Sequence, residues 1–186
     1  MEINKIAKQI SNFIIRRLIE VLGALISVFS ILLLTSLISY SPEDPNFIFT
    51  ENTTINNILG FRGSFISDIF FQSIGIISIL VSISFFITGI NIFKNKKILL
   101  FLENLFFIIL YSSLSSIFFK TFHSESFWLV INGNGGFVGS YLSNTFLVTI
   151  INLNREISYY ILIIIISILF LKSINFNIIT FLNSIK

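Results

Sequence analysis

The fold of this chain is decided by residues 69–119, which have the sequence IFFQSIGIISILVSISFFITGINIFKNKKILLFLENLFFIILYSSLSSIFF. Two long apolar runs, 69–93 and 98–119, lie on either side of the basic turn Lys94-Asn95-Lys96-Lys97. A hydrocarbon core of about 30 Å is crossed by roughly 20 helical residues, so each run is long enough to span a bilayer. Because the turn between them is short, we expect the two spans to form an antiparallel hairpin.

Two further apolar runs flank this hairpin, at residues 18–40 and 155–172. The first contains one charged residue, Glu20, near its start. The alternative interpretation, a cleavable signal peptide, requires a shorter apolar core and small residues at a cleavage site. The first run is longer and leads into a polar turn at Pro42, which favours an uncleaved anchor. The sequence therefore predicts an all-α integral membrane protein with four transmembrane helices, and residues 18–172 as its membrane domain.

The composition also indicates lipid as the solvent of this chain. Only 11% of its residues are charged and 54% are hydrophobic, and the mean hydropathy is +0.93. Soluble domains have about 25% charged residues, so this chain has too little polar surface for a soluble enzyme. It has no Cys and a single His, which argues against a protein-bound zinc site. We expect no catalytic residue, no metal and no cofactor.

The segment 137–153 is ambiguous. It is almost long enough to span, but polar residues interrupt it at Ser140, Ser143, Asn144, Thr145 and Asn152. We predict an amphipathic helix, interfacial or re-entrant, on the periplasmic side. If this segment spanned the membrane, the C-terminus would lie on the opposite side.

The distribution of charge predicts the orientation, because Lys and Arg gather on the cytoplasmic side of membrane proteins. With four spans and the N-terminus inside, only Arg62, Lys120 and Arg155 of the 12 Lys and Arg residues lie outside. Both termini are therefore expected in the cytoplasm. Residues 1–17 are expected to form an amphipathic helix on the membrane surface, and residues 173–186 a tail or the start of a linker.

Three motifs give the chain a family resemblance. The first span ends in residues 39–45, SYSPEDP, and residues 60–75, GFRGSFISDIFFQSIG, lead into the second span. A glycine-rich segment, residues 135–143, GGFVGSYLS, precedes the last span. The order of these elements over roughly residues 10–175 resembles the N-terminal membrane domain of the FtsK/SpoIIIE DNA translocases, which carries similar S-x-x-P-x-D-P and G-x-x-G-x-x-x-x-D patterns.

The resemblance implies a membrane anchor at the division septum of the bacterial inner membrane, in contact with the lipid bilayer and with cell-division proteins. Relatives couple this domain through a linker to an ATP-driven DNA motor, which implies a homo-oligomer, a hexamer if a motor is attached. This sequence contains no G-x-x-x-x-G-K-[ST] motif, the phosphate-binding loop of such a motor. We expect a fragment of a longer protein or a motorless homologue, without direct nucleic-acid binding by this region.

The residues expected to make functional or partner contacts come mainly from the three motifs. They are Pro42, Asp44, Pro45, Gly60, Arg62, Gly63, Asp68, Gly135 and Gly136, together with Glu103. Glu103 is the only acid well inside an apolar run, where a carboxylate marks a candidate functional site. It also lies close enough to Lys96 and Lys97 in sequence to meet a lysine or lipid headgroups.

Two further residues have structural explanations. Asp68 is expected to stabilise the positive end of the second span, because acidic side chains favour helix N-termini. Trp128, next to Phe127, is expected to anchor the chain at the membrane interface, where aromatic side chains are enriched, and binding of a partner protein is the alternative.

Other function classes make different demands on the sequence. A small transporter or channel subunit, the alternative hypothesis, needs ionisable residues at mid-membrane depth or broken helices in two corresponding halves. A membrane-embedded enzyme of lipid metabolism needs clustered His, Asp or Glu, and here His123 has only Glu125 nearby. The sequence therefore favours the anchor.

Overall fold

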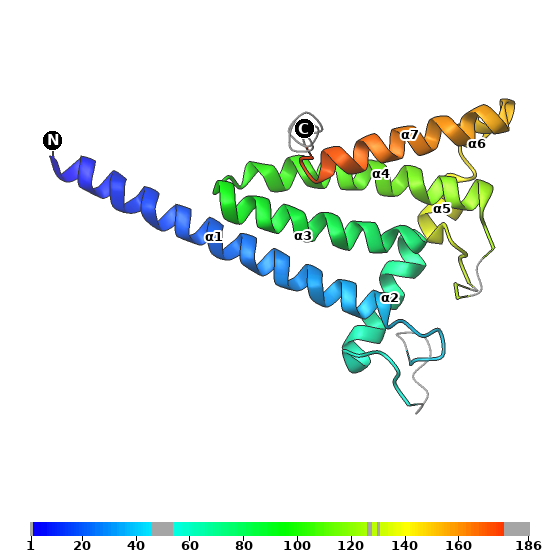
Figure 1. Cartoon of the computed structure of the whole chain (residues 1–186), viewed down its shortest axis with the longest axis horizontal. Coiled ribbons are helices and arrows are strands. Elements are labelled where there is room, and N and C mark those ends of the chain that lie inside the picture. Colours follow the sequence, from blue (N-terminus) through cyan, green and yellow to red (C-terminus); the bar gives the residue numbers. More distant parts are fainter. Residues whose placement is uncertain (1, 46–53, 126–127, 130, 177–186) are drawn as a thin grey trace, which may run out of the picture.

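The computed structural model describes residues 2–45, 54–125, 128–129 and 131–176, and it describes side chains from residue 6 onward (Figure 1). Its helices are α1 (Glu2–Ile38), α2 (Gly60–Ile74), α3 (Ser78–Asn95), α4 (Leu99–Phe122), α5 (Gly136–Leu142), α6 (Phe146–Leu153) and α7 (Arg155–Ser173). A short 3-10 turn, Gly75–Ile77, lies between α2 and α3. All the regular structure in the described part of the chain is helical.

Four stretches are long and apolar enough to cross a membrane. They are Ile6–Ile38, Gly60–Asn95, Leu99–Phe122 and Arg155–Ser173. The prediction of an all-α membrane protein with four spanning helices is confirmed. Helices α4 and α7 overlap the predicted third and fourth spans, 98–119 and 155–172.

The spanning helices form a row in the order α1, α3, α4 and α7, with α1 and α7 at opposite edges (Figure 1). Helix α2 turns away from the row and packs against α1 and α5. We call the end that carries α2, α5 and the long loops the loop end. The other end, at residues 94–97, is the hairpin end.

Helices α1 and α3 approach each other closely because small residues line their interface. A Cβ atom built on Gly23 would lie 2.6 Å from the backbone nitrogen of Phe93 and 2.8 Å from the carbonyl oxygen of Gly89. The Ser30 hydroxyl donates to the carbonyl oxygen of Ser82. Small side chains let helices pack closely in a bilayer, where no hydrophobic effect drives them together.

Larger side chains fill the other interfaces of the row. Between α3 and α4, together with the 3-10 turn, the buried residues are Ile77, Val81, Ile108 and Tyr111. Between α4, α6 and α7 they are Ile117, Phe118, Ile151 and Leu162. Helix α4 is therefore the central element on which the last two helices pack.

Helix α1 is longer than predicted. Residues 1–17 were expected to form a separate helix on the membrane surface, but α1 runs without a break from Glu2 to Ile38. The first glycine in this stretch is Gly23 and the first proline is Pro42, so no residue before the span interrupts the helix. Placement of residues 1–17 on the membrane surface stays a prediction.

An ion pair relates α1 to the hairpin end. The Glu20 carboxylate lies 2.7 Å from the Lys96 ammonium and 2.6 Å from the Arg17 guanidinium. Glu20 is therefore level with the turn between α3 and α4. Figure 1 shows the N-terminal part of α1 projecting past this turn.

The predicted second span, 69–93, is both longer and interrupted. Its helix begins at Gly60 and breaks at Gly75. The carbonyl oxygen of Asn134, from a distant loop, accepts the N–H of Ile76 (3.1 Å). The Gln72 carbonyl oxygen, an acceptor near the end of α2, takes a hydrogen bond from the side chain of Asn132 (3.3 Å). The loop thus supplies the partners that a continuous helix would have provided.

The segment 137–153 forms two short helices, α5 and α6, where a single helix was predicted. They are bent by 80°, the geometry of a broken span or a re-entrant loop. Polar side chains bond to the backbone at the break: the Ser143 hydroxyl donates to Ser140 O (2.7 Å) and the Thr145 hydroxyl to Leu142 O (2.6 Å). Such local bonds compete with helix continuation.

Candidate functional site

The three sequence motifs meet at the loop end, in a structure that we call the loop cap and define as residues 36–45, 56–75 and 132–139. Its first contact is made by Asp44, which is only 4% exposed. The carboxylate of Asp44 accepts the backbone N–H groups of Asn56 (2.8 Å) and Asn57 (2.9 Å). Bonds of this kind, to an ionised acceptor, are stronger than neutral ones. Asp44 therefore holds the returning loop against the end of α1.

The two prolines of the first motif have different environments. Pro42 is exposed, and Pro45 is buried. The carbonyl oxygen of Pro45 accepts a hydrogen bond from the hydroxyl of Ser64 on α2 (2.8 Å). The first motif is therefore attached directly to the second.

Asn57 connects the first motif to Gly63 and was not predicted as a site residue. Its side-chain nitrogen donates to the Ser36 carbonyl oxygen (2.9 Å), and its side-chain oxygen accepts the N–H of Leu59 (3.1 Å). A Cβ atom on Gly63 would overlap the Asn57 side chain. Gly63 is therefore required for packing. Gly60, the first residue of α2, donates its N–H to the Asn57 carbonyl oxygen (2.8 Å).

Asp68 is buried inside the loop cap, 7% exposed. It accepts hydrogen bonds from the Tyr40 hydroxyl (3.2 Å) and from the Gln72 amide (3.4 Å). Burial raises the pKa of the Tyr40 phenol, and the negative charge of Asp68 raises it further, so Tyr40 stays protonated as the donor. The expected role of Asp68 at a helix start does not hold, because α2 begins about two turns earlier, at Gly60.

The glycine-rich motif packs against the break between α2 and α3. A Cβ atom on Gly136 would lie 2.6 Å from the backbone nitrogen of Gly75 and 2.7 Å from the carbonyl oxygen of Ser73. The φ angle of Gly136 is +64°, a left-handed conformation that favours glycine. A Cβ atom on Gly135 would lie 2.9 Å from the backbone of Lys120 on α4. All three motifs and α4 are thus joined at the loop cap.

Two predicted site residues lie outside these contacts. Arg62 is exposed on α2, and Glu103 is exposed on α4. Within the described part of the chain no lysine forms an ion pair with Glu103, and Lys96 pairs with Glu20 at 2.7 Å. Of the two contacts that the sequence allowed for Glu103, the one with a lysine is not formed among the described residues, and the one with lipid headgroups stays a prediction.

A second group of hydrogen-bonded polar residues, which the sequence did not predict, lies between α3, α4 and α7. This polar cluster consists of Ser84, Thr88, Asn91, Asn104, Tyr111, Ser173 and Asn175. Asn104 is fully buried; it donates to the Thr88 hydroxyl (3.0 Å) and accepts from the Asn175 side chain (2.7 Å). Ser84 bonds both Tyr111 (2.9 Å) and Ser173 (3.1 Å). The cluster fixes the end of α7 to α3 and α4.

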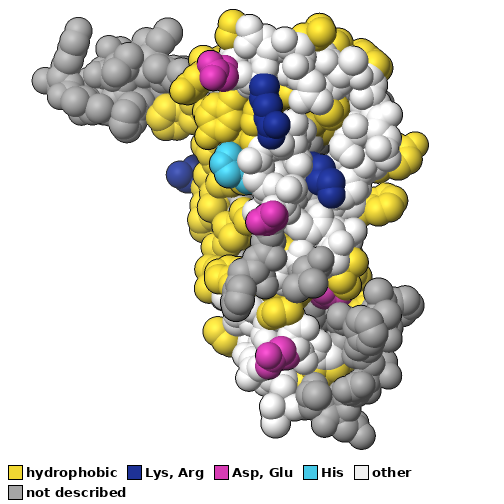
Figure 2. Space-filling model, turned by 90° about the vertical axis from the view of Figure 1, so that its right-hand side faces the viewer, with side chains coloured by type: hydrophobic (Ala, Val, Ile, Leu, Met, Phe, Trp, Pro, Cys, Tyr) yellow, Lys and Arg dark blue, Asp and Glu magenta, His cyan; other side chains and the backbone are white. Residues whose placement is uncertain are grey.

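The surface beside the first motif is hollowed. This contact hollow, of about 480 Å³, is lined by Leu37, Ile38, Tyr40, Ser41, Pro42, Glu43 and Trp128. Trp128 is 62% exposed, and its position at the membrane interface stays a prediction. Phe127 lies outside the described residues. Figure 2 shows the loop end face-on, with charged side chains of both signs among apolar ones.

The loop cap is suited to stabilising the fold and to contacting other proteins. No group of three or more His, Asp or Glu residues in the described ranges could hold a metal ion. Its polar atoms are mainly engaged with one another, as in the hydrogen bonds that Asp44 accepts from the backbone of Asn56 and Asn57.

Comparisons with known proteins agree with the motifs. The model of the family described as the 4TM region of DNA translocase FtsK/SpoIIIE matches residues 15–186. A protein of Rickettsia bellii (strain RML369-C) named DNA translocase FtsK is 30% identical over 77 residues, which are 41% of this chain and 10% of that protein. The matched stretch is therefore a small part of the relative's length. No solved structure matches this chain. This multi-pass inner-membrane chain belongs to the family of four-transmembrane regions of the FtsK/SpoIIIE DNA translocases.

Proposed function

We propose that this region places a DNA translocase at the division septum and contacts other cell-division proteins through the loop cap. The observation that carries the proposal is the assembly of all three motifs at one end of the molecule. Asp44 and Gly63 both contact the segment 56–57, and Gly136 closes on Gly75. The motifs thus build one rigid surface outside the lipid, which is where a partner protein can reach it.

The contact hollow is the part of this surface best suited to a partner. Exposed Trp128 and Pro42 provide apolar area, and exposed Glu43 provides a negative charge at the edge. Tryptophan is enriched among residues that dominate binding energy at interfaces. The partner that fits is a membrane protein that presents an apolar side chain beside a basic one.

Pairwise interaction assays in cells test this surface. The full chain is paired in turn with each membrane protein of the division machinery, and Trp128→Leu and Pro42→Gly are compared with Tyr141→Leu. Tyr141 is a similarly exposed aromatic residue on α5, outside the hollow. We expect the hollow variants to lose at least one interaction that Tyr141→Leu keeps. Equal interaction signals for all three variants would show that the contact hollow does not bind a partner.

The hairpin end is the proposed cytoplasmic side. Lys96 lies there, close to Glu20 of α1, and Ser173 at the end of α7 is bonded to Ser84 of α3. The polar cluster therefore sets the point at which the chain leaves the membrane domain. A motor joined to this point would start from a fixed position.

The open edges of the row support a homo-oligomer, a hexamer if a motor is attached. In the apolar window of α7 only 11% of the residues are buried. The chain has no Cys, so a cysteine introduced at Ile161 would be its only thiol. Disulfide-linked dimers of Ile161→Cys in membranes would support a neighbouring copy at α7, and a wholly monomeric product would argue against one.

The transporter alternative is less well supported. The chain has broken helices at Gly75 and at residues 143–145, but loop backbone occupies the first break, where Asn134 accepts from Ile76. In the polar cluster, the buried Asn104 side chain is paired with Thr88 and Asn175. These hydrogen bonds occupy polar groups that a substrate would need.

A further inference from the structure

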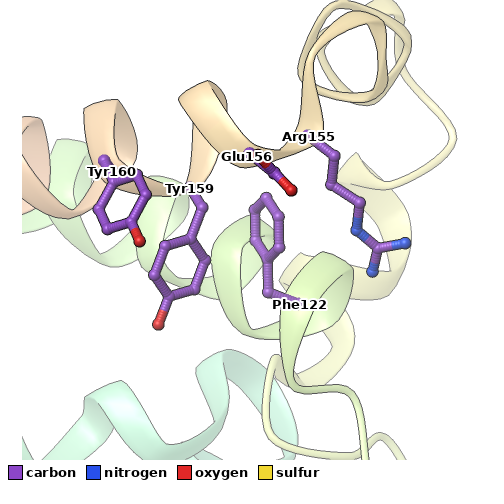
Figure 3. Close-up of a pocket in the computed structure, with 5 residues that line it drawn as sticks. All are labelled: Phe122, Arg155, Glu156, Tyr159 and Tyr160. Carbon is purple, nitrogen blue, oxygen red and sulfur yellow. The ribbon is translucent and has the colours of Figure 1, made fainter.

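An open groove of about 590 Å³ lies at the loop end, between the end of α4 and the start of α7. It is lined by Phe122, Arg155, Glu156, Tyr159 and Tyr160 (Figure 3). Arg155 and Glu156 are the first two residues of a membrane-spanning helix. They therefore lie at the boundary between water and hydrocarbon, and the two tyrosines lie about one turn deeper, at the usual level of aromatic side chains near lipid headgroups.

The aromatic part of the groove is held in place by neighbouring rings. The ring of Tyr159 is 5.2 Å from Phe118, 5.2 Å from Phe122 and 6.0 Å from His123, measured between centroids. Tyr160 is 67% exposed. Tyr159 thus forms a fixed wall, whereas Tyr160 remains available to a ligand.

The Arg155 guanidinium is held in place by its neighbours but does not use all of its N–H donors. Its guanidinium donates to the carbonyl oxygen of Thr121 (2.9 Å) and lies over the ring of Phe122, 5.5 Å from the centroid. A guanidinium has five N–H donors, so others remain for an anion such as a phosphate. Guanidinium groups are well suited to phosphate recognition.

Glu156 places a negative charge beside this positive one. It is exposed, and no cation in the described part of the chain forms an ion pair with it. A ligand carrying only negative charge would be attracted by Arg155 and repelled by Glu156. A ligand with a phosphate and an ammonium group satisfies both, and the tyrosine faces also attract a cation.

We infer that this groove binds the headgroup of a phosphatidylethanolamine molecule. Its phosphate accepts from Arg155, its ammonium donates to Glu156, and its upper acyl chains pack on Tyr159 and Tyr160. Choline offers Glu156 a positive charge but no N–H donor, and glycerol lacks the positive charge. The inference concerns the lipid contacts of this family region and does not rest on its placement at the septum.

Native mass spectrometry of the purified full chain in mild detergent tests the inference. The probes are dioleoyl phosphatidylethanolamine, phosphatidylglycerol and phosphatidylcholine, each added separately at matched concentration. We expect phosphatidylethanolamine to be retained by up to about fivefold over the other two, the range of one exposed ion pair. If phosphatidylcholine is retained as well as phosphatidylethanolamine, the N–H donors have no role. If phosphatidylglycerol is retained as well as phosphatidylethanolamine, Glu156 has no role.

Three variants test which charged side chain binds each charged group of the lipid. Glu156→Gln should abolish the preference for phosphatidylethanolamine over phosphatidylglycerol, and Arg155→Gln should weaken retention of both. Glu125→Gln is the matched control, because Glu125 is an exposed acid at the same end but outside the groove. A preference that persists in Glu156→Gln, or that disappears equally in Glu125→Gln, would overturn the inference.

Discussion

The carboxylate of Asp44 accepts the backbone N–H of Asn57 at 2.9 Å, across a separation of 13 residues. Its other oxygen accepts the N–H of Asn56 at 2.8 Å. One buried side chain therefore closes the first long loop onto the turn in which the first span ends. The side chain of Asn57 continues this contact to Ser36 of α1.

Asp44→Ala should loosen the loop cap. The substitution leaves two backbone N–H groups without their charged acceptor, and the loss is about 1.5–3 kcal/mol for such hydrogen bonds. We expect a lower midpoint of thermal unfolding in detergent and faster amide exchange at residues 56 and 57. Glu43→Ala, at the exposed neighbouring acid, should change neither. If both variants unfold at the wild-type midpoint, Asp44 does not hold the loop.

Gly136→Ala should destabilise the chain more than Gly60→Ala. Both glycines have a φ angle of +64°, which costs an L-residue about 1–2 kcal/mol. Only at Gly136 would a Cβ atom also meet backbone, at Gly75 and Ser73, whereas no atom lies within 4 Å at Gly60. Unfolding midpoints of the two variants measure the difference. Equal midpoints would show that the glycine-rich motif is not packed against the break as described.

The four spans could be predicted because hydropathy and length decide them directly. The resemblance also selected residues that meet in space, since Asp44, Gly63, Asp68 and Gly136 all lie in the loop cap. The break in the second span depended on tertiary contacts instead. The second span breaks at Gly75 because Asn134 packs there, and no local pattern distinguishes this glycine from one inside a continuous helix.

Asn57 and Asn104 were missed for a related reason. Asparagine is common along this chain, and only the folded structure shows that these two are buried with partners for their side chains. Glu103 was singled out because it is an acid within an apolar run, but it faces outward. Glu20, at the edge of a run, makes the ion pair with Lys96. Which face of a membrane helix is buried depends on its neighbours in the row.

Asn104→Ala should weaken the attachment of α7. It removes a partner from both Thr88 and Asn175, and hydrogen bonds between membrane helices contribute about 0.6–2 kcal/mol each. We expect a lower unfolding midpoint and increased amide exchange at residues 173–176. Glu103→Ala, one residue earlier on the same helix and exposed, is the control. Unchanged amide exchange at residues 173–176 in Asn104→Ala would show that the polar cluster does not fix the end of α7.

The hairpin end should face the cytoplasm. Because the chain has no Cys, single cysteines at Glu43 and Lys97 report the two ends of the row without background. A membrane-impermeant maleimide added to intact cells should label Glu43→Cys and leave Lys97→Cys unlabelled until the membrane is opened. The reverse pattern would invert the proposed orientation.

The position of the chain in dividing cells tests the septal proposal most directly. A fluorescent protein is fused to the full chain, and its intensity at midcell is compared with that of a uniformly distributed membrane dye in the same cells. We expect enrichment at constricting midcells, which falls to the level of the dye in Trp128→Leu and persists in Tyr141→Leu. A wild-type chain that follows the dye around the whole cell outline would contradict the proposal that this region places the protein at the septum.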